Sequence, residues 1–136
     1  MSNVVLDASA LLTLLNAEPG ADVIEAAMAA DGAVMSVVNW AEVLSKAVET
    51  GVTPEAVRER LERAGILGTL LRIEPVTEED AATIARLRPL TRPAGLGLGD
   101  RACLALAKRL GAPAVTVDRV WASIAGAVGV EVRIAR

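Results

Sequence analysis

The sequence has 136 residues, a formal net charge of −3, no histidine and a single cysteine. This is the length of one domain with a substantial core, and the lack of histidine excludes Ser-His-Asp and Cys-His catalysis and every His-ligated metal site. Hydrophobic residues make up 53% of the chain and aromatic residues 1%, so the core must be aliphatic and aromatic stacking on nucleic-acid bases can contribute little.

The first half of the chain alternates short apolar runs with helical patterns. Val4-Val5-Leu6 predicts a strand, and the Ala- and Leu-rich segment after it predicts a helix that ends before Pro19-Gly20. A second strand is expected over 33–36. Thr53 followed by proline and glutamate is typical of a helix start. The expected helices of this half cover residues 8–16, 21–30, 39–49 and 55–64.

The second half continues the alternation of strands and helices. Strands are expected over 70–73, 114–117 and 130–134, and helices over 77–87, 100–110 and 120–125. Residues 88–99, with two prolines and three glycines, are expected to be an irregular connection. Strands separated by helices predict an α/β fold with a mainly parallel sheet of about five strands that is covered on both faces.

We expect one soluble, cytoplasmic domain over residues 1–136. No basic region precedes the first apolar run. No apolar stretch approaches the ~20 residues that a membrane-spanning helix needs. The single thiol, Cys103, can form neither an internal disulfide nor a cysteine-rich zinc site, so we expect it to be a small buried hydrophobic residue.

Charge is distributed unevenly along the chain. Residues 1–45 contain six acidic and no basic residues, whereas residues 86–136 contain nine basic and three acidic residues. A polyanion would therefore find its phosphate contacts mainly in the second half. Each of these basic residues, taken singly, is also typical of a solvated surface.

Four acidic residues fall near the carboxyl ends of the predicted strands. Asp7 follows the first strand, Asp118 the fourth, Glu42 lies early in the helix after the second strand, and Asp100 starts the helix before the fourth. The carboxyl ends of an open parallel sheet share one edge, where such folds bind ligands. Clustered carboxylates would repel by roughly 4 kcal/mol per pair at ~4 Å and an effective dielectric of ~20, so they need a cation. Oxygen ligands alone favour Mg²⁺ or Mn²⁺ over zinc.

Each acid also has a purely structural interpretation. Asp7 and Asp118 could be helix N-caps, and Asp100 could be an acid in a first turn that the helix dipole favours. Asn39-Trp40-Ala41-Glu42 has the form of a capping box, although that box normally begins with Ser or Thr. Composition and spacing alone leave both interpretations open.

Four stretches together resemble the acidic motifs of PIN-domain ribonucleases, most closely the VapC toxins of bacterial toxin–antitoxin pairs. They are Val5-Leu6-Asp7-Ala8-Ser9-Ala10-Leu11-Leu12, Val38-Asn39-Trp40-Ala41-Glu42-Val43-Leu44, the stretch from Leu98 through Asp100 to Ala107, and Val115-Thr116-Val117-Asp118-Arg119-Val120-Trp121. The resemblance implies a three-layer α/β/α sandwich, a homodimer, and a small antitoxin protein that blocks the site. It also implies the site residues: Asp7, Glu42, Asp100 and Asp118 as the catalytic acids around the metal, with Ser9 and Asn39 as polar support near the substrate.

The resemblance thus implies an endoribonuclease that depends on Mg²⁺ or Mn²⁺. One or two bound ions would activate a water and neutralise charge on the scissile phosphate of an RNA, which requires no histidine. Arg101 and Arg119 each follow one of the acids directly and are candidate phosphate contacts, although either could also be a solvated surface residue.

Two other classes of function stay open. A phosphatase-like metal hydrolase also places an Asp after its first strand, but Asp7-Ala8-Ser9 lacks the second Asp two residues on. A catalytically weak binding module would keep the fold while losing acids, and no acid is missing from these motifs.

Overall fold

The computed structural model describes residues 3–136, and at its centre lies a five-stranded parallel sheet. The strand order is β3-β2-β1-β4-β5, and every neighbouring pair is parallel, which confirms the predicted sheet. The strands are β1 (Val4–Leu6), β2 (Ala33–Ser36), β3 (Leu71–Glu74), β4 (Ala114–Thr116) and β5 (Val132–Ile134).

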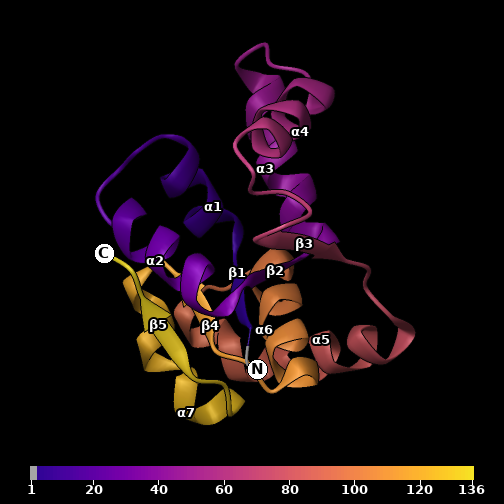
Figure 1. The fold of residues 1–136 in the computed structure, drawn as a ribbon. Helices are drawn as coiled ribbons and strands as arrows, with labels where there is room; N and C mark the ends of the chain where they lie inside the picture. The colour runs from indigo at the N-terminus through magenta and orange to yellow at the C-terminus, as the bar shows by residue number, and fades with distance from the viewer. Residues whose placement is uncertain (1–2) are drawn as a thin grey trace.

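Helices cover both faces of this sheet and make the three-layer α/β/α sandwich that the sequence resemblance implies (Figure 1). They are α1 (Ala8–Leu15), α2 (Ala21–Asp31), α3 (Val37–Glu49), α4 (Pro54–Arg63), α5 (Glu78–Thr91), α6 (Leu98–Leu110) and α7 (Ala125–Val128). Two short 3-10 helices, η1 (Arg92–Ala94) and η2 (Arg119–Ser123), lie before α6 and after β4.

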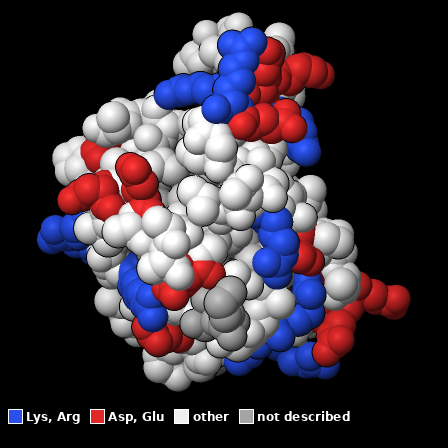
Figure 2. Space-filling model, in the orientation of Figure 1, with Lys and Arg blue, Asp and Glu red and all other residues white. Residues whose placement is uncertain are grey.

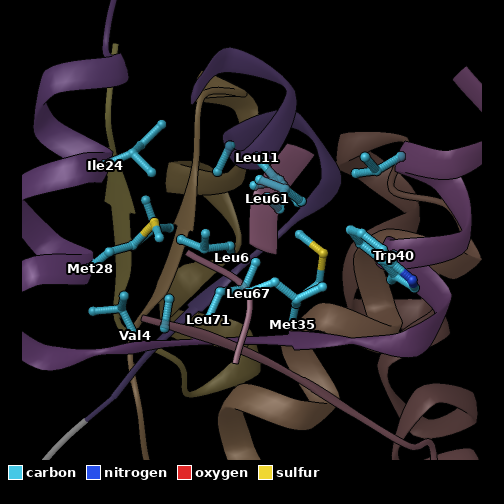
Figure 3. Packing of buried hydrophobic residues seen from close by; sticks show 14 of the residues in the cluster. Val4, Leu6, Leu11, Ile24, Met28, Met35, Trp40, Leu61, Leu67 and Leu71 are labelled. Carbon is cyan, nitrogen blue, oxygen red and sulfur yellow. The ribbon is translucent and has the colours of Figure 1, made fainter. Parts of the chain in front are cut away.

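The alternation of side chains along β1 divides the core in two. Val4 and Leu6 pack with residues of α1 to α4 on one face, as Figure 3 shows. Val5, between them, packs on the other face with α5, α6, η2 and α7. All three side chains are fully buried, as expected of a central strand of a parallel sheet. The two aliphatic layers hold β1 and β4 rigidly side by side.

The larger differences from the predicted boundaries are in α3, α5, α6 and β5, and the helix expected over 120–125 is replaced by η2 and α7. Helix α3 begins at Val37 rather than residue 39, because the hydroxyl of Ser36 caps it by accepting a hydrogen bond from the Val38 amide. Helix α5 continues through Pro89 to Thr91, so residues 88–99 are less irregular than expected. Helix α6 begins at Leu98, and β5 begins at Val132 rather than residue 130.

Helices α3 and α4 form an arm that extends away from the sheet (Figure 1). The outer helix α4 carries ion pairs one helical turn apart, Arg58 with Glu62 and Arg63 with Glu59. At the same end of the molecule, Figure 2 shows a mixed group of basic and acidic side chains. Within residues 3–136 no helix is both long and apolar enough to cross a membrane.

Candidate functional site

The candidate site lies where the order of the strands reverses. From β1 the chain moves outward to β2 and β3, and β4 then returns to the other side of β1. In open parallel sheets, the crevice at the carboxyl ends of the two strands that flank such a reversal is the usual ligand site. Asp7 directly follows β1, and Asp118 comes two residues after the end of β4. The topology therefore brings two of the four predicted acids to this crevice.

Asp7 is a buried carboxylate, only 3% exposed, surrounded by hydrogen-bond donors. Its Oδ1 accepts from the Ala10 amide at 2.9 Å and from the Ser9 hydroxyl at 2.7 Å, and its Oδ2 accepts from the Thr116 hydroxyl at 2.6 Å. Burial raises the pKa of Asp7 to about 6, although these three donors lower it and the charge of Asp100 raises it further. Asp7 thus caps α1, as one interpretation expected, but its charge is also held at the centre of the site.

Thr116, which the sequence analysis did not single out, is the side chain that ties β4 to Asp7. It is fully buried, donates to Asp7 and accepts a 3.1 Å hydrogen bond from the Asp118 amide. The Ser9 hydroxyl lies 3.2 Å from that of Thr116 and accepts from the Val117 amide. The only signal in the sequence was a hydroxyl residue among apolar strand residues, two positions before Asp118.

Glu42 and Asn39 reach the site from α3. Asn39 is fully buried, and its Nδ2 donates to Glu42 Oε1 at 2.9 Å and to the carbonyl of Gly99, in the first turn of α6, at 2.9 Å. The expected capping box from Asn39 to Glu42 is wrong, because Ser36 caps the helix one turn earlier and Asn39 lies inside it. Glu42 is exposed to solvent.

Asp100 is half-buried in the first turn of α6. Its Oδ2 accepts a 3.1 Å hydrogen bond from the Gly97 amide, which is the capping role expected of a first-turn acid. Burial raises the pKa of Asp100; the Gly97 amide lowers it, and the charges of Glu42 and Asp118 raise it further. Asp118 is exposed and caps η2 through its Oδ1, which accepts from the Val120 amide at 3.1 Å.

The four acids therefore act on one another electrostatically. Asp7 is influenced by Asp100, and Asp100 by Glu42 and Asp118, although the four residues come from four separate segments. No basic side chain makes an ion pair with any of them in residues 3–136. The cluster is a region of uncompensated negative charge, which favours a bound cation.

The donors suit a hard divalent cation, with one restriction. In the described part of the chain, no three Asp, Glu or Cys side chains are arranged so that they could hold one metal ion together. Mg²⁺ usually keeps several of its waters and is bound by only one or two carboxylates together with substrate phosphates. Asp100, Glu42 and Asp118 each keep one carboxylate oxygen that accepts no hydrogen bond within residues 3–136. The residues thus fit a Mg²⁺ or Mn²⁺ ion that keeps part of its water shell better than an ion enclosed by protein ligands alone.

The two predicted phosphate contacts lie in different environments. Arg119 is exposed at the start of η2, next to Asp118. Arg101 is only 6% exposed, and its Nη1 donates to the Ile84 carbonyl of α5 at 3.0 Å. This burial corrects the expectation that Arg101 lies on the surface. Cys103, also on α6, is fully buried as expected, and burial raises the pKa of its thiol well above the ordinary value.

Exposed arginines beside the site are found instead on the segment that leads to α6. Arg92 begins η1, which packs against η2. Neither Arg92 nor Arg119 forms an ion pair within residues 3–136, whereas Arg109, Arg133 and Arg136 each pair with an acidic residue. Arg119 follows Asp118 directly and Arg92 lies on the element that packs against η2, so these two exposed arginines are the candidate phosphate contacts.

A groove in the structure is separate from the acids. It has a volume of about 460 Å³ and lies between α1, α3 and α4. Its walls are mostly apolar, with Leu12, Val43 and Val57 among them, and Lys46 and Arg60 add positive charge. None of the four acids lines this groove.

Comparison with known proteins gives a family and a set of similar structures. The family model described as "PIN domain" matches residues 4–127. No curated protein sequence matches the chain. A toxin–antitoxin complex from Klebsiella pneumoniae is similar over 98% of each chain, with 20% identity and a TM-score of 0.70. DNA-bound VapBC from Salmonella typhimurium is similar over 100% of each chain, with 18% identity and a TM-score of 0.72.

A third similar structure is described by the RNA element that it cleaves. It is VapC20 from Mycobacterium tuberculosis, called a Sarcin-Ricin loop cleaving toxin. The similarity covers 89% of this chain and 95% of that one, with 17% identity and a TM-score of 0.68. At these identities the similar structures establish a shared fold.

Proposed function

Because this chain belongs to the PIN domain family, we propose that it is a metal-dependent endoribonuclease that acts as the toxin of a toxin–antitoxin pair. The observation that carries the proposal is the gathering of Asp7, Glu42, Asp100 and Asp118 into one uncompensated acidic cluster at the reversal of strand order. Toxins with this fold and only distant sequence similarity support the assignment.

Asp7, Glu42, Asp100 and Asp118 are the residues we propose as metal ligands, each binding directly or through water. When bound, Mg²⁺ or Mn²⁺ supplies a water of lowered pKa and positive charge against the scissile phosphate. Ser9 and Thr116 fix the orientation of the Asp7 carboxylate through hydrogen bonds of 2.7 and 2.6 Å. Asp7 then presents its charge in one direction without reorganisation, which is how preorganised sites lower a barrier.

Phosphate contacts of an RNA substrate are assigned to Arg119 and Arg92. Both are exposed and lie on 3-10 helices in mutual contact, one following Asp118 and the other preceding the helix of Asp100. Contacts of this kind set register along the backbone and supply affinity that does not depend on sequence. A buried guanidinium such as that of Arg101 is in no position to do so.

Two protein partners belong to the proposal. Similar structures are described as complexes of toxin and antitoxin, and we propose that this chain also binds an antitoxin. A homodimer is proposed as well, supported by exposed apolar residues at the starts of α3 and α6, Val37 and Leu98, which are 41% and 60% exposed. Light scattering that finds only monomer at micromolar concentration contradicts the dimer.

The decisive experiment is RNA cleavage by the purified chain with Mg²⁺ or Mn²⁺, beside a sample in excess EDTA and the variant Asp100→Asn. Cleavage that needs the metal and disappears in the variant supports the proposal. Cleavage that persists after thorough chelation contradicts the metal dependence. A chain that binds RNA but never cleaves it would instead be the catalytically weak binding module.

A further inference from the structure

The side chain of Asn39 joins two helices of the candidate site. Its Nδ2 donates to Glu42 Oε1 within α3 and to the Gly99 carbonyl in α6, both at 2.9 Å. Both partners are acceptors, so only the amide NH₂ group can face them, which fixes the orientation of the side chain. Each of its two N–H groups is therefore committed, one to each helix.

The Glu42 side chain lies close to the backbone of α6 because residue 99 is glycine. A Cβ atom added to Gly99 would lie 2.6 Å from Glu42 Cδ and 2.7 Å from its Oε2, which is closer than real contacts allow. The Glu42 carboxylate thus rests against the first turn of α6, immediately before Asp100. The negative charge of Glu42 is among the causes that raise the pKa of Asp100.

The buried amide of Asn39 lowers the stability of the fold. It is fully buried, and its Oδ1 has no hydrogen-bond partner in the described part of the chain. A buried acceptor without a donor lowers stability, and leucine, which has a similar volume, would avoid that loss. Packing alone does not explain an amide at this position. Its two donors do, because they hold the Glu42 carboxylate beside the Gly99 carbonyl, next to Asp100, although the two acids repel.

We propose that Asn39 is a positioning residue that fixes Glu42 against the Asp100 turn of α6, so that both carboxylates face one divalent cation. This inference rests on the proposed function. Because Asn39 is buried, it supports the site through Glu42 and Gly99 and does not contact the substrate, in contrast to the expectation from the sequence. Without the amide, the exposed Glu42 side chain turns toward solvent and the first turn of α6 loosens.

The test compares Asn39→Leu with Thr91→Val, which makes the same change from polar to apolar at a fully buried position on α5, where the hydroxyl bonds only carbonyls of its own helix. Three quantities are measured: Mn²⁺ affinity by calorimetric titration, kcat and KM for RNA cleavage, and amide hydrogen exchange over residues 97–101 without metal. We expect Asn39→Leu to lose at least tenfold in Mn²⁺ affinity and in kcat, to keep KM within twofold, and to exchange faster over 97–101. Thr91→Val should match the parent in all three.

Gly99→Ala tests the same contact between Glu42 and α6 from the side of α6. It tests the inference on its own if Asn39→Leu does not fold. Its methyl group displaces Glu42, so we expect a similar loss of Mn²⁺ affinity. Parental Mn²⁺ affinity and kcat in Asn39→Leu, or parental Mn²⁺ affinity in Gly99→Ala where Asn39→Leu is unfolded, would overturn the inference. The parent protein separates the proposed function from the role of Asn39: if it cleaves no RNA with Mg²⁺ or Mn²⁺, the proposed function fails. If the parent cleaves RNA and Asn39→Leu behaves as the parent, only the role of Asn39 fails.

Discussion

The Thr116 hydroxyl donates a 2.6 Å hydrogen bond to Asp7 Oδ2, joining residues 109 positions apart in the chain. The bond links the carboxyl ends of the two central strands, β1 and β4, and both side chains are buried. No cation of the described chain pairs with Asp7, so its negative charge is supported only by hydroxyl groups and one amide. In the metal-free protein at neutral pH, the Asp7 carboxylate is therefore a buried negative charge that no cation compensates.

Asp7→Asn should stabilise the metal-free protein at pH 8 but not at pH 4. The pKa of Asp7 is about 6 in the folded chain and 3.8 ordinarily, so the folded state binds the proton more tightly. Its contribution to the free energy of unfolding is full below 3.8 and is lost as pH rises through about 6. Since asparagine resembles the protonated acid, the variant avoids that loss, which is on the order of 3 kcal/mol.

Urea unfolding in EDTA between pH 4 and 8 measures this difference. The control is Glu25→Gln, which removes an exposed acid of α2 and should show no such dependence on pH. If the free energy of unfolding of Asp7→Asn differs from that of the parent by the same amount at every pH, the effect comes from packing and not from the charge.

Asp80→Asn should have the opposite effect. Burial raises the pKa of Asp80, but the hydrogen bonds from Arg109 and Thr77 and the charge of Arg109 outweigh it, so the pKa is lowered below 3.8. The stability that this carboxylate contributes is present above pH 3.8 and is lost as pH falls below it. We expect a loss of about 1–3 kcal/mol at pH 7, shrinking toward pH 3, as measured by urea unfolding.

The neighbouring variant Glu79→Gln is the matched control, because Glu79 is exposed in the same first turn of α5. Arg109 pairs with Asp80 at 2.9 Å, and the Thr77 hydroxyl and Asp80 form a reciprocal capping box. A loss that stays undiminished at pH 3 would show that the capping bonds, rather than the charge, carry the stability.

The sheet was predictable from the sequence, whereas the partners of the polar side chains were not. Strands such as 33–36 are short apolar runs bounded by helical patterns, and the structure confirms that range to the residue. Asp7 and Asp118 could be placed because parallel strands share a carboxyl edge. Thr116 could not, because its role depends on meeting Asp7 across the sheet.

Asn39 and Arg101 show why local patterns mislead. The spacing of Asn39 and Glu42 occurs both in a capping box and in the interior of a helix, and only the position of Ser36 distinguishes the two. A positive charge on α6 predicts an exposed residue, yet the packing of α5 against α6 buries Arg101. The Ile84 carbonyl accepts one hydrogen bond from the Arg101 guanidinium.

Removing Arg92 and Arg119 together should weaken RNA binding and flatten its dependence on salt. Each phosphate contact to a single strand contributes a slope of about 0.7 in log K against log salt, so the double alanine variant should lose up to about 1.4. Filter binding of RNA to the inactive Asp100→Asn protein from 50 to 300 mM salt measures the slope.

Arg58→Ala combined with Arg63→Ala is the control matched for charge, because both arginines pair with glutamates on α4, which lies on the arm away from η1 and η2 (Figure 1). This control should leave the slope unchanged. If the variant without Arg92 and Arg119 keeps the parental slope, or if the control flattens it equally, the RNA surface lies elsewhere.

Asp100→Asn should abolish RNA cleavage without lowering metal-free stability. Burial and the charges of Glu42 and Asp118 raise the pKa of Asp100, so removing its charge relieves repulsion. Asparagine can still accept the hydrogen bond from the Gly97 amide. Asp100→Ala loses that cap as well, at about 0.5–2 kcal/mol. Comparing the two variants without metal therefore separates the charge from the capping bond.

The response to Mg²⁺ completes the test. A ligand at about 100 times its Kd stabilises the folded state by about 2.7 kcal/mol, so the parent should melt several degrees higher with saturating Mg²⁺. We expect Asp100→Asn to lose most of that shift, and Glu131→Gln, which removes an exposed acid on the opposite side of β4 from β1, to retain it. Thermal melts with and without Mg²⁺ give the answer. An Asp100→Asn protein that is clearly less stable without metal, yet shifts with Mg²⁺ as the parent does, would make Asp100 a helix cap and nothing more.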